Sequence, residues 1–121
     1  MPRITHFDIP ADDPNRAQKF YCEVFDWKFE KWDGPTDYWM ATTGTEEPGI
    51  NGGLSKRMPG QIGITNTITV SSVDEFSKKI MEKGGQMIVP KMPIPGIGWF
   101  AQCTDTEGNI FGIIEMDSKA K

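Results

Sequence analysis

The chain has 121 residues, of which 25% are charged and 37% hydrophobic, and its formal net charge is -4. This length predicts one domain, 1–121, with enough apolar residues for a core. The acidic balance argues against nucleic acid or an anionic membrane as partner, because both require a basic face. No apolar run approaches the roughly 20 residues that span a bilayer, and no signal-like segment opens the chain, so we expect a cytoplasmic protein.

The first half begins with an expected strand at 4–9 and an amphipathic helix after it. Asp13 can cap this helix and Pro14 suits its first position, and apolar residues then recur at helical spacing to about Phe25. Further strands are predicted at 27–32, 38–43 and 51–56, separated by a turn and by a loop rich in Gly, Glu and Pro.

The second half follows the same plan, with a strand at 64–70 and a helix over 72–83. Ser72 and Glu75 form a capping box, and Gly84 with Gly85 supplies the stop. Strands at 86–89, 99–104 and 109–116 follow, with a Pro- and Gly-rich loop after the first and a turn before the last. The predicted order is therefore β-α-β-β-β twice.

Short matches between the halves support a duplication. Residues 4–5 recur at 64–65 and residues 39–41 at 99–101, both at a shift of 60, and residues 53–54 recur loosely at 112–113. The sequence predicts module 1 at about 1–58 and module 2 at about 62–118, joined by a hinge near Pro59-Gly60. A ferredoxin-like sheet with extra strands is the alternative, but it leaves the fourth strand of each half unused.

Several segments resemble glyoxalase-like proteins: 6–13 and 20–27 are similar to their first strand and helix, and 105–112 to their turn into the last strand. Residues 90–99 are similar to a small branch related to lactoylglutathione lyase. The chain thus resembles the glyoxalase/bleomycin-resistance/dioxygenase (vicinal oxygen chelate) superfamily. The resemblance implies an α+β fold in which two βαβββ modules form an incomplete, curled eight-stranded barrel around a cavity. It also implies a homodimer, because a second chain commonly completes such cavities.

Metal-dependent members of this family place their ligands on the first and last strands of each module. The first-strand position matches His6, and its counterpart in the second half is Thr65 or Asn66, depending on a one-residue choice of offset. The last-strand positions fall on Gly53 and Gly112. Only one of four positions carries a strong metal ligand, whereas a catalytic site usually needs three, so we predict no cofactor and no complete metal site.

If a divalent metal does bind, the resemblance makes His6 and Glu115 its ligands. Glu115 lies three residues beyond Gly112, and an odd shift along a strand turns a side chain to the opposite face. A β-bulge after Gly112 could reverse that orientation. The sequence favours Glu115 as an ordinary strand-end surface residue.

His6 is the only histidine, and its parity matches that of Asp8, so both should lie on one face of the first strand. This pair is the candidate catalytic site, with His6 as acid or base; an inert histidine inherited from a metal-binding ancestor is the alternative. The candidate ligand-binding residues are Trp39, Trp99, Thr65 and Gln102, although the sequence favours paired core packing for the two tryptophans and surface exposure for Gln102.

Three functions follow from these residues. The favoured function is binding of a small, partly apolar molecule in the cavity without a complete metal site. The main alternative is a divalent-metal-dependent lyase, isomerase or dioxygenase that acts on vicinal oxygens. A third is metal-free acid–base chemistry by His6 and Asp8. Lactoylglutathione lyase itself is disfavoured, because its expected metal set is missing. Both cysteines, Cys22 and Cys103, are expected to be reduced core residues.

Overall fold

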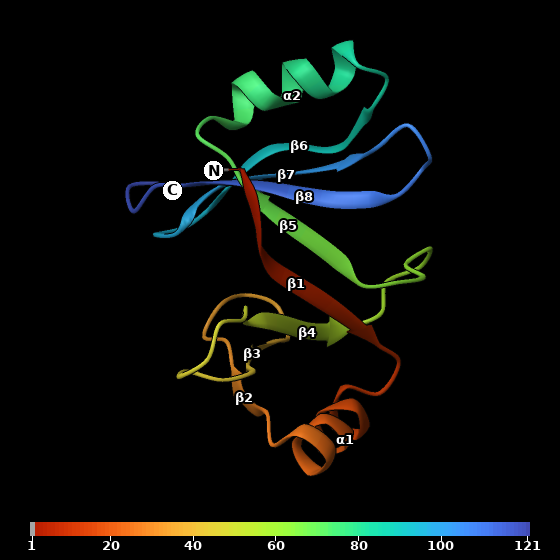
Figure 1. The fold of residues 1–121 in the computed structure, drawn as a ribbon, viewed down its shortest axis with the longest axis vertical. Coiled ribbons are helices and arrows are strands. Elements are labelled where there is room, and N and C mark those ends of the chain that lie inside the picture. The colour runs from red at the N-terminus through yellow and green to blue at the C-terminus, as the bar shows by residue number, and fades with distance from the viewer. Residues whose placement is uncertain (1) are drawn as a thin grey trace. The chain divides into compact units, whose positions relative to one another are not determined.

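The structure is a computed structural model that describes residues 2–121, and it contains two helices and eight strands (Figure 1). The helices and strands follow the β-α-β-β-β order twice, which confirms the predicted α+β class and its duplicated plan. Their bounds are β1 (Arg3–Ala11), α1 (Pro14–Phe25), β2 (Lys28–Lys31), β3 (Tyr38–Thr42), β4 (Gly52–Lys56), β5 (Thr65–Thr69), α2 (Val73–Glu82), β6 (Gln86–Ile94), β7 (Gly98–Thr104) and β8 (Ile110–Met116).

The chain divides into two compact units, His6–Ile64 and Thr65–Lys121, the latter joined by the chain up to Thr5. We call them the first and second modules. The hydrogen-bonded strand order is β2-β3-β4-β1 in the first module and β5-β8-β7-β6 in the second. In the first module β1 runs parallel to β4, and in the second β5 runs parallel to β8, while the remaining pairs within each module are antiparallel.

The predicted caps confirm why the helices begin where they do. The Asp13 carboxylate accepts a hydrogen bond from the Arg16 N–H at 3.1 Å, and the Ser72 hydroxyl accepts one from the Glu75 N–H at 3.1 Å. Each cap satisfies an N–H that has no partner inside the helix. Gly84 has φ +101, the left-handed conformation that ends a helix and that glycine adopts at low cost.

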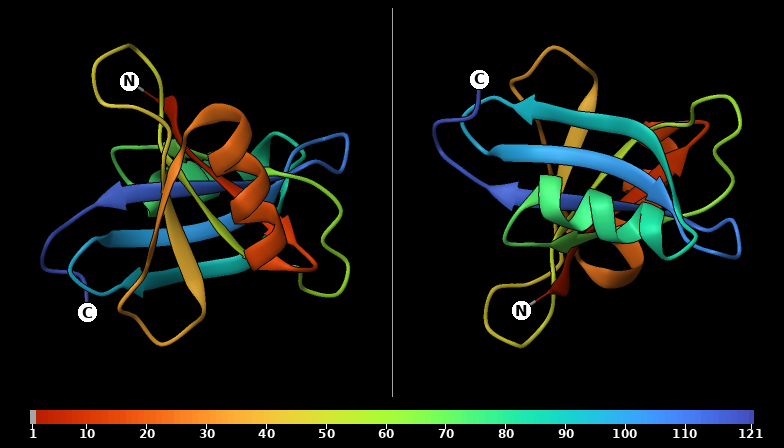
Figure 2. Two further views of the ribbon diagram at one scale, coloured as in Figure 1. Left: turned by 90° about the horizontal axis from the view of Figure 1, so that it is seen from below. Right: turned by 90° about the horizontal axis from the view of Figure 1, so that it is seen from above.

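The two modules differ in how well their helices are packed. In the second module α2 lies against β6, β7 and β8 (Figure 2), and Val73 at its start is fully buried in a core with Val70, Ala101, Cys103 and Ile113. The core of the first module is smaller, with Ile9, Ala11 and Leu54 buried. None of the α1 side chains is buried, so α1 covers its core only partly.

Two expectations are corrected by the packing. The strand predicted at 86–89 continues to Ile94, because β6 is an edge strand whose register shifts between Met87 and Met92 accommodate Pro90. Cys103 is buried as expected, but Cys22 is exposed. Cys22 lies outside the apolar stripe of α1, and none of the side chains of that helix is buried.

No helix within residues 2–121 is long and apolar enough to cross a membrane.

Candidate functional site

The first module separates its apolar and polar side chains by strand parity. Phe7, Ile9 and Ala11 belong to or pack against the core beneath α1. His6 and Asp8 alternate with them along β1, so their side chains point to the opposite face of the sheet. We call this face, away from α1, the open face of the first module.

On this face His6 and Asp8 meet a third side chain, Tyr38 from the start of β3. The Tyr38 hydroxyl lies 2.6 Å from Asp8 Oδ1 and 2.8 Å from His6 Nε2, and His6 Nε2 lies 3.3 Å from Asp8 Oδ1. The three polar groups therefore form a closed triangle, which we call the His6–Tyr38–Asp8 cluster. The side chains of His6 and Asp8 are 39% and 29% exposed, so the cluster is partly accessible to a ligand.

The hydrogen bonds assign the protons within the cluster. A carboxylate only accepts hydrogen bonds, so the Tyr38 hydroxyl donates its proton to Asp8. The same hydroxyl oxygen can then only accept from His6, which places a hydrogen on Nε2. Nδ1 has no hydrogen-bond partner among residues 2–121. His6 thus leaves its second ring nitrogen free to contact a ligand.

Burial of the phenol, reinforced by the negative charge of Asp8 and the hydrogen bond to it, raises the pKa of Tyr38 well above its usual range. Both the low-dielectric surroundings and the neighbouring carboxylate disfavour a phenolate. Tyr38 is therefore a neutral hydrogen-bonding group throughout the physiological range and does not act as a base.

Gly53 is the residue that makes room for Tyr38. A Cβ atom built on Gly53 would collide with the Tyr38 hydroxyl and ring. Gly53 pairs with Asp8 across β1 and β4, so any larger side chain there would displace Tyr38 from the cluster. The last-strand position where the resemblance expected a metal ligand is thus occupied by the phenol of another strand.

The second module repeats this arrangement with different chemistry. Thr67 pairs with Gly112 as Asp8 pairs with Gly53, and a Cβ on Gly112 would come within 2.7 Å of the Phe100 ring. Phe100 therefore occupies the place that corresponds to Tyr38. This register sets the offset at 59, so the counterpart of His6 is Thr65, one of the two residues that the sequence left open.

The two candidate tryptophans lie on the helix side of their modules. Trp39 packs against the core of the first module and Trp99 against that of the second, and the Trp99 indole N–H donates to Asp117 at 3.1 Å. Core packing was the alternative interpretation. Their predicted equivalence through the repeat is wrong: Trp39 pairs with Leu54, whereas Ala101 pairs with the matching Ile113. Trp39 therefore matches Ala101, at an offset of 62. Because this offset exceeds the predicted 60 by two residues, Trp99 lies on the same face as Ala101 but at a different position along the strand.

The remaining candidates are also placed by strand parity. Gln102 is half-buried and alternates with the core residues Ala101 and Cys103, so it points away from α2. Glu115 lies on the α2 side, as its odd spacing from Gly112 predicts, and its Oε1 accepts a hydrogen bond from the Val73 N–H at 3.0 Å. Glu115 therefore caps α2.

The described residues do not fit a three-ligand metal centre. Within residues 2–121 no three His, Cys, Asp or Glu side chains are grouped so that they could hold a metal ion. His6 and Asp8 supply two donor groups, and the third group beside them is a neutral phenol. The absence of a cofactor stays a prediction, and we derive no chemical step through a metal.

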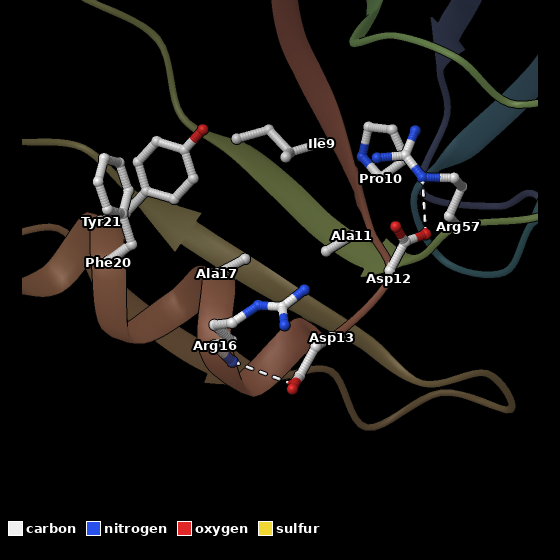
Figure 3. A pocket seen from close by; sticks show the side chains of 10 residues that line it. All are labelled: Ile9, Pro10, Ala11, Asp12, Asp13, Arg16, Ala17, Phe20, Tyr21 and Arg57. Carbon is white, nitrogen blue, oxygen red and sulfur yellow. Dashed lines mark hydrogen bonds and ion pairs between the residues drawn. The ribbon is translucent and has the colours of Figure 1, made fainter.

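Two hollows lie on the surface of the first module, each of about 450 Å³ or slightly less. One lies between α1 and the end of β1 (Figure 3), and the other lies beside the loop before β4. None of His6, Asp8 and Tyr38 lines either of them. The cluster is thus a partly open polar site on a sheet face, separate from both hollows.

Sequence reasoning found His6 and Asp8 but missed the role of Tyr38, which it placed only at the start of a strand. Tyr38 is half-buried in the structure. The available signal was Gly53: a glycine opposite Asp8 in a strand leaves a vacancy that a large side chain from the adjacent strand can fill.

Comparison with known proteins gives the family. The model of the Glyoxalase/Bleomycin resistance protein/Dioxygenase superfamily matches residues 3–113. The proteins named "Putative glyoxylase CFP32" from Mycobacterium bovis and Mycobacterium tuberculosis are 31% identical over 113 residues, which is 88% of this chain and 42% of each of those proteins. The chain therefore spans less than half the length of the curated relatives that it matches.

Solved structures agree on the fold. A variant of the Streptomyces coelicolor methylmalonyl-CoA epimerase is 15% identical, with a TM-score of 0.71 and coverage of 100% of this chain and 99% of that one. The epimerase from Mycobacterium tuberculosis is 11% identical, with a TM-score of 0.71 and coverage of 94% and 87%. At these identities the likeness shows the fold alone. With the family model matched over most of its length, the chain belongs to the Glyoxalase/Bleomycin resistance protein/Dioxygenase superfamily.

Proposed function

We propose that this chain binds a small, partly apolar molecule at the open face of the first module, and that the His6–Tyr38–Asp8 cluster moves a proton on it. The observation that carries the proposal is the closed triangle of hydrogen bonds, 2.6, 2.8 and 3.3 Å long. It includes His6 and Asp8, the two residues of β1 that the sequence predicted as the catalytic pair. A histidine held by a carboxylate and a neutral phenol is oriented as a catalytic base must be.

The roles of the three residues follow from their protons. His6 Nδ1 accepts a proton from a carbon next to a carbonyl group or from a hydroxyl group of the ligand. Asp8 lies 3.3 Å from Nε2, so its charge stabilises the imidazolium that forms. Tyr38, kept neutral by burial and by Asp8, holds both partners in place. Returning the proton to a neighbouring atom would complete an isomerisation.

Two observations support this chemistry over metal-assisted catalysis. The described chain groups only His6 and Asp8 at the position where the resemblance expects ligands, and Tyr38 fills the space over Gly53. The curated relatives are named as glyoxylases, a name that fits chemistry on small carbonyl compounds. Because this chain covers 42% of their length, their activity enters here only as part of the proposal.

A second copy of the chain is the partner we propose in addition. Phe20, Val24 and Phe25 on α1 are each more than half exposed, which is unusual for large apolar side chains on a single helix. Size-exclusion chromatography with light scattering would measure the mass directly, and a monomer at micromolar concentration would contradict the homodimer.

The proposed function is tested by hydrogen–deuterium exchange at carbon. Chelator-treated protein is incubated in D₂O with a panel of small α-hydroxy and α-keto carbonyl compounds, and proton NMR follows loss of the C–H signal. We expect at least one compound to exchange, and the His6→Gln variant to be at least about 100-fold slower. Glu23→Gln, an exposed change on α1 and away from the open face, is the matched control.

Two outcomes would overturn the proposal. Exchange that appears only after a divalent metal is restored would favour the metal-dependent lyase, isomerase or dioxygenase. Exchange that is equal in the wild type and in His6→Gln would remove the cluster from the chemistry. Native-state binding of the same panel, measured by NMR line broadening, separates a failure of catalysis from a failure of binding.

A further inference from the structure

The hollow beside α1, which we call the α1 hollow, combines an apolar floor with charged walls. Its volume is about 440 Å³, within the range of small-molecule sites. Ile9, Ala11 and Ala17 form its floor, and Phe20 and Tyr21 from α1 form one side (Figure 3). A flat or alkyl group could be buried against these side chains.

Two guanidinium groups also line the hollow, those of Arg16 on α1 and of Arg57 (Figure 3). Arg57, which follows β4, is fixed by three hydrogen bonds: Nε to Asp12 Oδ1 at 2.9 Å, Nη1 to the Gln61 carbonyl at 3.1 Å, and its own N–H to the Ala11 carbonyl at 2.9 Å. A guanidinium held in this way loses little conformational freedom when it binds a ligand.

Arg16 differs from Arg57 because no carboxylate of residues 2–121 lies within 4.0 Å of its guanidinium. Its side chain points from α1 into the hollow (Figure 3). The nearby Asp13 carboxylate is already used, since it caps the Arg16 N–H. Arg16 is therefore a cation beside an apolar floor without a partner charge, and an anionic ligand would supply one.

The charge balance selects the kind of anion. Arg16 and Arg57 carry two positive charges, and Asp12 and Asp13 carry two negative ones. Since Arg57 is already paired with Asp12, Arg16 supplies one cation for one monoanionic group, whereas a phosphate dianion would keep a second, uncompensated charge close to Asp12 and Asp13. We propose that the α1 hollow binds an organic monocarboxylate with an aromatic or alkyl body, its carboxylate on Arg16 and its body on the apolar floor. This site does not involve the His6–Tyr38–Asp8 cluster.

Three probes with the same ring test the proposal: naphthoate, neutral naphthamide and naphthyl phosphate. Binding to the intact chain is followed by proton–nitrogen NMR shifts of α1 and of the segment around Arg57. We expect naphthoate to bind at least ten times more tightly than naphthamide, and more tightly than naphthyl phosphate. Arg16→Gln should weaken naphthoate binding at least tenfold and leave naphthamide unchanged.

The control is Lys19→Gln, which removes the same charge from an exposed residue of the same helix outside the hollow. Equal effects of Arg16→Gln and Lys19→Gln would show that only net charge matters and would overturn the proposal. Tighter binding of the phosphate, or no preference for naphthoate over naphthamide, would also overturn it. His6→Gln should leave naphthoate binding unchanged, whereas a loss there would place the ligand at the other site.

Discussion

At the scale of single residues, Tyr38 decides what the first module can do. Its hydroxyl bridges His6 and Asp8 within 2.8 Å, and it stays protonated because burial and Asp8 oppose its ionisation. His6 and Asp8 without Tyr38 would be two residues on one strand face. With Tyr38 they become a fixed constellation in which only one histidine nitrogen remains for a ligand.

The raised pKa of Tyr38 predicts a pH dependence of stability. A group whose pKa is higher in the folded than in the unfolded chain contributes stability that is complete below its unfolded pKa, which is 10.0 for tyrosine, and that is lost as the pH rises above it. The free energy of unfolding of the wild type should exceed that of Tyr38→Phe by about 1–2 kcal/mol at pH 7. Urea unfolding between pH 7 and 11 should show this difference shrinking above pH 10, and a constant difference would contradict the shift.

Gly53 should tolerate no side chain while Tyr38 is in place. Gly53→Ala puts a Cβ on the Tyr38 hydroxyl, so we expect a loss of about 1–3 kcal/mol in unfolding free energy and a change in the chemical shifts of the His6 ring. Gly49→Ala is the control, because a Cβ there meets nothing within 4 Å. Adding Tyr38→Ala should recover part of the loss, and no recovery would show that the strain lies elsewhere.

At the scale of helices and strands, duplication has kept the backbone positions and changed the side chains. Gly53 and Gly112 occupy equivalent positions in the two modules, and each lies beneath an aromatic ring. The arrangement of β3 beside β4 is thus repeated by β7 beside β8. The chemistry was not retained, since the second module has Thr65 and Phe100 where the first has His6 and Tyr38.

Glu115 links two elements, because its side chain on β8 accepts a hydrogen bond from the start of α2. Glu115→Ala leaves the Val73 N–H without its partner, and we expect a loss of about 1–2 kcal/mol in unfolding free energy. Glu107→Ala, in the exposed turn before β8, should cost less than about 0.5 kcal/mol. Chemical denaturation measures both, and equal costs would argue against the capping role.

The unequal packing of the helices predicts unequal dynamics. No α1 side chain is buried, whereas α2 is anchored by the fully buried Val73. Amide hydrogens of α1 should therefore exchange with solvent faster than those of α2, because local opening exposes less apolar surface. Hydrogen exchange followed by NMR reports each helix separately. Equal protection would mean that α1 is covered in solution, as in the proposed homodimer.

At the scale of the whole molecule, metal content separates the two main functional hypotheses. Since residues 2–121 group no three suitable ligands, tag-free protein purified after growth with Mn, Fe, Co, Ni and Zn should hold no stoichiometric metal. Inductively coupled plasma mass spectrometry measures this directly. Near-stoichiometric metal that is lost in His6→Ala would make the metal-dependent enzyme the leading hypothesis.

The sequence by itself determined much of this protein. Capping residues such as Asp13 and Ser72 act through local hydrogen bonds, so the starts of both helices were predictable from neighbouring residues. Strand parity likewise placed His6 with Asp8 on one face and turned Glu115 away from Gly112, because side-chain alternation depends only on position along a strand.

Only the tertiary structure decided which strands meet and in what register. The offset of 59 that matches His6 with Thr65, and the offset of 62 that matches Trp39 with Ala101 rather than Trp99, arise from pairings between strands far apart in the sequence. Tyr38 joins the cluster for the same reason, since its partners lie about 30 residues away along the chain. Contacts of this kind depend on how non-local strands pack, which no local pattern of residues records.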